Sequence, residues 1–259
     1  PAAMSRVLVV LISVLLVGLA GILYSLLSAF ASINLKADQT IGGTALNLLA
    51  TAIAVVIAKY FSDSGSAKLN YSNKPFLFSI GGLELSIFVP LGIVLLVISY
   101  VVLYKTRFGL RLRACGEHPQ AADSVGINVY KMRYAGTTIS GALAGMGGFV
   151  YALTTANCAS NGDVAGFGFL ALAVMIFGNW KPVNIAVSSL LFGLFKCIAA
   201  SYASIDINGD GVYMLAEIGI SAHLYRMLPY IVTLLVLAFT SKSSRAPKAE
   251  GIPYDKGQR

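Results

Sequence analysis

A short acidic segment carries oxygen-bearing side chains at a spacing that could bind calcium. Asp206, Asn208, Asp210 and Glu217, with Gly211 at the turn, fit the loop pattern of an EF-hand. Calcium prefers hard oxygen ligands at these positions and a glycine that allows the chain to turn. Asn-Gly and Asp-Gly are also ordinary turn formers. We predict a turn and no bound metal, and calorimetry with calcium on the Glu217→Gln variant would decide between the two interpretations.

Elsewhere the sequence lacks the spacing of a catalytic or nucleotide-binding motif. It contains neither the glycine-rich Walker A pattern nor the HExxH pattern of zinc proteases. Its three cysteines, Cys115, Cys158 and Cys197, are far apart and form no metal-type or disulfide-type group. We therefore expect no catalytic residue and no cofactor in this chain.

Several polar side chains interrupt otherwise apolar stretches. Polar groups are costly inside a membrane, so they mark either a solute path or a contact between helices. Asn47 follows Thr44 by one helical turn, and an amide can bind hydroxyl groups or base edges without carrying charge. For Lys196 the alternatives are that its long stem carries the ammonium group to water or that the side chain faces a partner. The tentative solute-path residues are Thr44, Asn47, Asn157, Asn179 and Lys196.

The composition explains where these residues must lie. Hydrophobic residues make up 57% of the chain and charged residues only 12%, which is outside the range of a soluble domain. Uncharged stretches close to the length of about 20 residues are expected to cross the hydrocarbon layer as helices. The predicted fold is an all-α polytopic transmembrane bundle of about seven spans, at 7–32, 41–58, 85–104, 134–162, 164–180, 182–205 and 227–241.

Positive charges predict the orientation of the loops. Lys and Arg concentrate in residues 105–133 and after residue 241, whereas residues 204–222 contain acidic residues and no Lys or Arg. The positive-inside rule therefore makes the first two regions cytoplasmic and the third external. We predict a transmembrane domain over 1–241 with a cytoplasmic loop at 105–131, and a cytoplasmic tail over 242–259.

The net charge of +8 is explained by this topology. A basic cytoplasmic surface also favours anionic membrane lipid, and nucleic acid is not needed to account for it. Counting the predicted spans back from the basic loop places residue 1 outside, although Arg6 favours an internal start. From this conflict we expect an N-terminally truncated chain in which the first segment is a spanning helix.

The basic loop has features of a docking element. Pro119 suits the start of a short helix that ends near Gly126. The small side chains of Ala121 and Ala122 would let this helix approach a partner closely, and the flanking arginines could meet an acidic rim. A solvated loop that only sets the topology is the alternative.

The segment after this loop carries small residues at helical spacing. Gly141 and Gly145 form a GxxxG pair, and Ala144 and Gly148 repeat the pattern. Two helices can pack closely along such a seam. We favour static packing over a seam that shifts during transport.

The loop sequence from residue 106 to 130, TRFGLRLRACGEHPQAADSVGINVY, resembles the coupling loop of bacterial ABC importer permeases of the branched-chain amino acid, ribose and nucleoside group. The likeness continues through residues 139–148. Residues 39–50, 227–238, 246–247 and 251–254 are similar to the nucleoside and simple-sugar branch. His118 differs, because the family more often has Asn there. The resemblance assigns ATPase coupling to Arg113, Ala114, Gly116, Glu117, His118, Pro119, Ala121, Ala122 and Gly126.

This resemblance implies a permease of the bacterial cell (inner) membrane with several partners. They are a cytoplasmic ABC ATPase that binds ATP and Mg, a second permease subunit and an extracytoplasmic solute-binding protein. The chain would then import nucleosides or related sugar-containing solutes without an ATPase site of its own. An ion-gradient-driven transporter or channel for a small polar solute is the alternative, which predicts ionisable groups in several spans.

Overall fold

The structure is a computed structural model, and it shows two compact units that are described separately. The first comprises Pro1–Ala165 with Pro247–Arg259, and the second comprises Gly166–Ala246. The residues described are 3–62, 69–70, 72–154, 159–160, 162–201, 224, 227, 230–232, 234–235 and 246–256. The calcium-type segment at Asp206, Asn208, Asp210 and Glu217 and the solute-path candidate Asn157 lie outside them.

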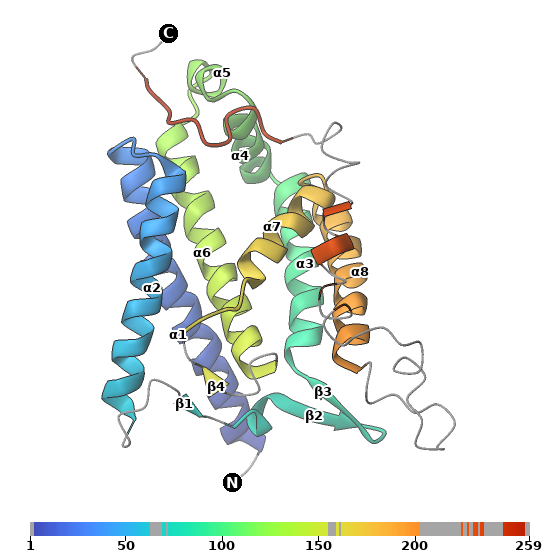
Figure 1. The fold of residues 1–259 in the computed structure, drawn as a ribbon. Helices are drawn as coiled ribbons and strands as arrows, with labels where there is room; N and C mark the ends of the chain where they lie inside the picture. The colour runs from blue at the N-terminus through green and yellow to red at the C-terminus, as the bar shows by residue number, and fades with distance from the viewer. Residues whose placement is uncertain are drawn as a thin grey trace. The chain divides into compact units, whose positions relative to one another are not determined.

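Four long helices form the first unit (Figure 1): α1 (Ala3–Ala29), α2 (Gln39–Phe61), α3 (Phe88–Lys105) and α6 (Val129–Thr154). A π-helical turn, Phe30–Asn34, continues α1. Asp38 caps α2, because its carboxylate accepts from the backbone N–H groups of Thr40 at 2.8 Å and Ile41 at 3.0 Å. The N–H groups of Ile41 and Thr40 hold the pKa of Asp38 below its ordinary value.

Two short helices connect α3 to α6: α4 (Arg107–Glu117) and α5 (Pro119–Ser124). The chain turns sharply at Thr106, whose hydroxyl donates to the carbonyl of Val102 at 2.6 Å and accepts from the N–H of Gly109 at 3.1 Å. Gly109 lies so close to the backbone of α3 that a side chain there would collide with the carbonyl groups of Val102 and Leu103. A capping threonine and a glycine thus set the start of the loop.

Short strands, which the sequence analysis did not predict, lie at the opposite end of this unit from α5 (Figure 1). β1 (Leu69–Asn70) pairs antiparallel with β4 (Ala159–Ser160), and β2 (Leu77–Ile80) pairs with β3 (Leu83–Ser86). Gly81 and Gly82 form the hairpin turn with φ angles of 60° and 89°, which favour glycine. Leu85 therefore belongs to a strand rather than to the third span.

The end of the unit that carries the strands has an aromatic core. Phe76 and Phe88 stack with ring centroids 5.7 Å apart, and Phe149 of α6 meets Phe76 edge-on at 5.4 Å. The buried Phe76, Phe88 and Leu153 and the half-buried Phe149 pack against α1 through Val10 and Val14. The hairpin is thereby fixed to the ends of α1, α3 and α6.

The second unit contains α7 (Phe167–Phe177) and α8 (Pro182–Ser201). Phe177 and Phe192 pack edge-to-face at 6.2 Å. Between the helices the chain turns through Gly178–Trp180, where Asn179 and Trp180 adopt positive φ angles of 53° and 56°. The sequence analysis placed Asn179 inside a span. That prediction was wrong, because Asn179 lies in the turn between α7 and α8.

Four helices among the described residues are long and apolar enough to cross a membrane, at Arg6–Asn34, Gln39–Phe61, Phe88–Lys105 and Pro182–Ala200. The expectation of an all-α, polytopic membrane protein is confirmed in its helical character, whereas seven spans are not confirmed. Helix α7 has 11 residues, about 16 Å of helix, which is too short for a hydrocarbon layer of about 30 Å. The predicted span at 164–180 was therefore too long.

Candidate functional site

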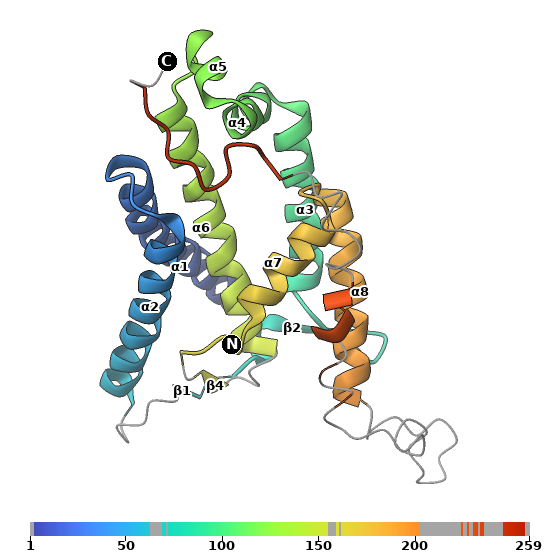
Figure 2. The same ribbon diagram turned by 45° about the horizontal axis from the view of Figure 1, so that its top comes forward.

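The α4–α5 segment protrudes at one end of the first unit, with the C-terminal segment beside it (Figure 2). His118 separates the two helices and caps α5, because its Nδ1 accepts from the N–H of Ala121 at 3.3 Å. Pro119 occupies the first position of α5, as the sequence predicted. Asn is among the strongest capping residues, and His118 performs the same capping here, so its departure from the family pattern leaves the start of α5 intact.

A small apolar cluster, called the seat of α5, packs this helix against the rest of the unit. It consists of Cys115, Ala122, Val129 and Tyr254, which are 1–5% exposed. Pro119 is also buried, whereas Ala121 is exposed. The two alanines therefore differ in position: Ala122 faces inward to the cluster and Ala121 faces outward, where a partner can approach it.

The remaining predicted coupling residues surround this seat. Gly116 and Ala114 are half-buried, whereas Glu117, His118 and Gly126 are exposed. Gly126 has a φ of 82° and ends the turn after α5. The guanidinium of Arg113 lies 4.6 Å from the centroid of the Tyr104 ring at the end of α3. Arg113 thus contacts α3, and Glu117, Ala121 and Val125 are exposed at the surface of this loop.

The C-terminal segment packs against this loop, which the sequence analysis did not predict. The N–H of Ala249 donates to the carbonyl of Gly116 at 3.0 Å, and Arg133 of α6 donates to the carbonyl of Ile252 at 3.0 Å. Asp255 forms an ion pair with Lys36 at 2.9 Å. The short apolar run Ile252–Tyr254 in an otherwise polar tail was the local signal for a buried contact.

Positive charge collects around this end of the unit. Arg107, Arg111, Lys105 and Lys131 are exposed there. The ion pair with Asp255 raises the pKa of Lys36 above its ordinary value. The connection between α1 and α2 lies at the same end, because Tyr134 of α6 donates to the side-chain oxygen of Asn34 at 2.6 Å.

The glycines of α6 form a close seam with α1. A Cβ at Gly145 would lie 2.6 Å from the carbonyl oxygen of Val17, and one at Gly141 would lie 2.6 Å from that of Gly21. Gly148, which the small-residue pattern also included, has open space where a Cβ would point. The seam is therefore made by Gly21, Gly141 and Gly145, and α1 and α6 make the most extensive contact among the described helices.

Helix α2 carries a polar stripe that includes two predicted solute-path residues. Thr40, Thr44, Asn47 and Thr51 follow one another at intervals of four, three and four residues and are all exposed, so they share one helical face. The hydroxyl of Thr44 donates to the carbonyl of Ile41 at 2.9 Å. Within the described part of the chain, the side-chain amide of Asn47 makes no hydrogen bond.

In the second unit, Lys196 of α8 is paired with an aromatic ring. Its Nζ lies 3.9 Å from the centroid of Phe167 in α7 and 6.0 Å from that of Tyr230. A cation over an aromatic face is stabilised by the ring quadrupole. The predicted solute-path residues are thus distributed between α2 in one unit and α8 with the α7–α8 turn in the other.

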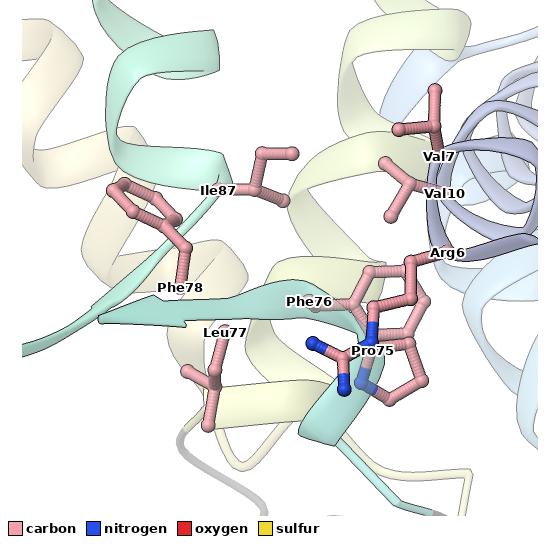
Figure 3. A pocket seen from close by; sticks show the side chains of 8 residues that line it. All are labelled: Arg6, Val7, Val10, Pro75, Phe76, Leu77, Phe78 and Ile87. Carbon is pink, nitrogen blue, oxygen red and sulfur yellow. The ribbon is translucent and has the colours of Figure 1, made fainter. Parts of the chain in front are cut away.

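A pocket of about 220 Å³ lies at the end of the first unit that carries the strands (Figure 3), lined by Arg6, Val7, Val10, Pro75, Phe76, Leu77, Phe78 and Ile87. Its walls are apolar apart from Arg6. None of the predicted solute-path residues lines this pocket. We therefore do not assign it to the solute path.

The four apolar helices of spanning length define a polytopic membrane protein. The family model described as "Branched-chain amino acid transport system / permease component" matches residues 2–237, and the chain belongs to this family. It is a membrane permease subunit of an ABC transporter, in which a separate subunit hydrolyses ATP.

Curated relatives agree with this assignment. The nucleoside ABC transporter permease protein NupC of Lactococcus lactis is 42% identical over 95% of this chain and 78% of its own length. The guanosine ABC transporter permease protein NupQ of Bacillus subtilis is 40% identical over 93% and 76%, respectively. The putative glucose ABC transporter permease protein TsgC13 of Haloferax volcanii is 28% identical over 86% and 73%. No solved structure matches the chain.

Proposed function

We propose that this permease imports nucleosides through a path formed with a second permease subunit. A cytoplasmic ATPase that binds ATP and Mg drives the transport, and an extracytoplasmic binding protein delivers the solute. Similarity to permeases named for nucleosides and guanosine supports the solute class, because two such relatives are at least 40% identical to this chain over the aligned residues.

The observation that carries the proposal is the position of α5. It is held by a cap at His118 and by the burial of Pro119 and Ala122, while Ala121 remains exposed. A short helix fixed at its inner face and free at its outer face suits a groove on another protein. Exposed cations on α4 and α6 would meet acidic groups around that groove.

The stripe on α2 supports the position of the solute path. A lipid-facing amide near the middle of a span is unfavourable, and the exposed Asn47 lies in line with Thr44 and Thr51. This face therefore suits water or a second permease subunit better than hydrocarbon. The amide and hydroxyl groups can donate to and accept from ribose hydroxyls and base edges without selecting for a charged solute.

Uptake into proteoliposomes tests this proposal. Complexes reconstituted with and without the ATPase should take up radiolabelled guanosine only when the ATPase and ATP are present. Excess unlabelled nucleosides should compete, whereas ribose and leucine should not. Uptake that persists without the ATPase would refute ATP coupling, and competition by leucine alone would refute the solute class.

The proposal also requires that the loop carrying α4 and α5 faces the cytoplasm, and a single cysteine on this loop can test that orientation. Cys115 is only 3% exposed, whereas Val125 just after α5 is 75% exposed. In a variant in which serine replaces the native cysteines, Val125→Cys should therefore react with an impermeant maleimide only from the cytoplasmic side. Labelling from the outside alone would place the loop on the wrong side for an ATPase.

A further inference from the structure

The C-terminal strap, Pro247–Asp255, touches three parts of the first unit that are distant in sequence. Ala249 is bonded to Gly116 at the end of α4, and Ile252 is bonded to Arg133 of α6, each at 3.0 Å. Asp255 pairs with Lys36 in the connection between α1 and α2 at 2.9 Å. One segment therefore joins the loop that carries α5 to the ends of two long helices.

Tyr254 is the anchor of this strap. Its side chain is only 5% exposed, and its ring meets that of Tyr130 at 5.3 Å with an interplanar angle of 66°. It belongs to the same buried cluster as Cys115 of α4 and Ala122 of α5. The strap thus supplies the largest side chain in the seat of α5.

Helix α5 depends on such support because of its length. It has six residues, and isolated helices shorter than about 12–15 residues are only marginally stable in water. Its position must be set by packing. The inner contacts available to it come from α4, from the start of α6 and from Tyr254.

We propose that the C-terminal strap is a positioning element of the coupling apparatus. It holds α5 in the pose in which the ATPase docks, and it links that pose to the α1–α2 connection through Lys36. The proposal rests on the proposed function, since it assumes that α5 receives the ATPase. Positioning here means that Tyr254 acts through α5 and does not itself touch the solute.

Replacing the anchor tests the role of the strap. Tyr254→Ala should reduce uptake per ATP hydrolysed by about tenfold or more, given the cost of emptying a large buried site. The matched control is Ile252→Ala, because that side chain is 57% exposed and its backbone bond to Arg133 is retained. Equal coupling ratios in Tyr254→Ala and the wild type would overturn the proposal.

The rate at which Cys115 reacts with maleimide measures how well Tyr254 covers the buried cluster under α5. Burial raises the pKa of its thiol, and both burial and the loss of thiolate slow its reaction with maleimide. With Cys158 and Cys197 replaced by serine, Tyr254→Ala should label Cys115 about tenfold faster than Ile252→Ala, because the local seat opens more often. Equal labelling would show that the strap does not cover the seat.

A disulfide between the strap and α4 distinguishes positioning from a general effect on folding. A Cβ at Gly116 would lie 3.6 Å from the Cβ of Pro247, within the range of disulfides. In a chain without native cysteines, Gly116→Cys with Pro247→Cys should cross-link under mild oxidation. The bond should restore coupled uptake to Tyr254→Ala, and a reductant should remove the rescue.

The outcomes separate this proposal from the proposed function. When the wild type transports, a cross-link that forms without rescue, or a cross-link that does not form, would overturn the positioning role of the strap. If the wild-type complex shows no ATP-dependent uptake, the proposed function fails. The maleimide and cross-linking results would still report whether Tyr254 seats α5.

Discussion

The seam between α1 and α6 predicts a large difference between two glycine-to-alanine substitutions on the same helix. Gly145 and Gly147 both lie in α6. A Cβ at Gly145 would lie 2.6 Å from the carbonyl oxygen of Val17 and 3.2 Å from the Cα of Gly21, whereas one at Gly147 would have no neighbour within 4 Å. Because the obstacles are backbone atoms, only a separation of the two helices can relieve the overlap.

The expected magnitude follows from this geometry. Overpacking costs about 1–3 kcal/mol, and both variants gain the same helix propensity of about 0.5–1 kcal/mol when alanine replaces glycine. The propensity therefore cancels, and Gly145→Ala should be less stable than Gly147→Ala by about 1–3 kcal/mol. For a chain of this size, that difference lowers the Tm by about 2–4 °C per kcal/mol.

Thermal unfolding of the two variants in the same detergent, followed by size-exclusion fluorescence, measures this difference. Gly147→Ala should unfold at or slightly above the wild-type temperature, and Gly145→Ala below it. Equal unfolding temperatures in the two variants would refute the close contact with α1. A stable Gly145→Ala variant that has lost transport would instead indicate that the seam moves during the cycle and would contradict static packing.

Three further predictions concern the coupling loop, the cap of α2 and the lysine of α8. Glu117→Arg or Ala121→Trp should abolish co-purification of the ATPase without preventing membrane insertion, and normal co-purification would contradict docking at α5. Because the pKa of Asp38 is depressed, its carboxylate stabilises the folded protein above about pH 4, and this stabilisation is lost as the pH falls through the folded pKa. Asp38→Asn should therefore make the unfolding temperature less sensitive to acid. An unchanged dependence of the unfolding temperature on pH would refute the cap. Lys196→Arg should retain uptake because a cation stays over Phe167. Lys196→Met should lower uptake by roughly 2- to 30-fold. Equal uptake by the two variants would exclude a role for the charge.

The long helices could be predicted from hydropathy because crossing a bilayer imposes a length and an apolar composition on each span. The start of α5 was also predictable, since Pro119 fixes its own backbone angle. Leu85 was misplaced because a run of apolar residues does not distinguish a short strand from the start of a helix. The adjacent glycines at 81 and 82 were the local signal for the hairpin.

The contacts of the C-terminal strap could not be predicted by the same reasoning. Tyr254 and Cys115 are far apart in sequence, and no local pattern states that one covers the other. Asn179 was misplaced because a polar residue beside an apolar run reads equally well as the end of a helix. Gly148 continued the small-residue spacing, yet a Cβ there would meet no neighbour, and α1 approaches the glycines of α6 most closely at Gly141 and Gly145. The crossing of two helices cannot be read from one of them.

The burial of Tyr254 against α5 also has a consequence for biosynthesis. Ribosomes make the chain from its N-terminus, so α4 and α5 emerge long before residue 254 does. The buried cluster under α5 stays incomplete until residue 254 has been translated. If α5 receives the ATPase as proposed, a complete docking site exists only on chains whose synthesis has passed that tyrosine.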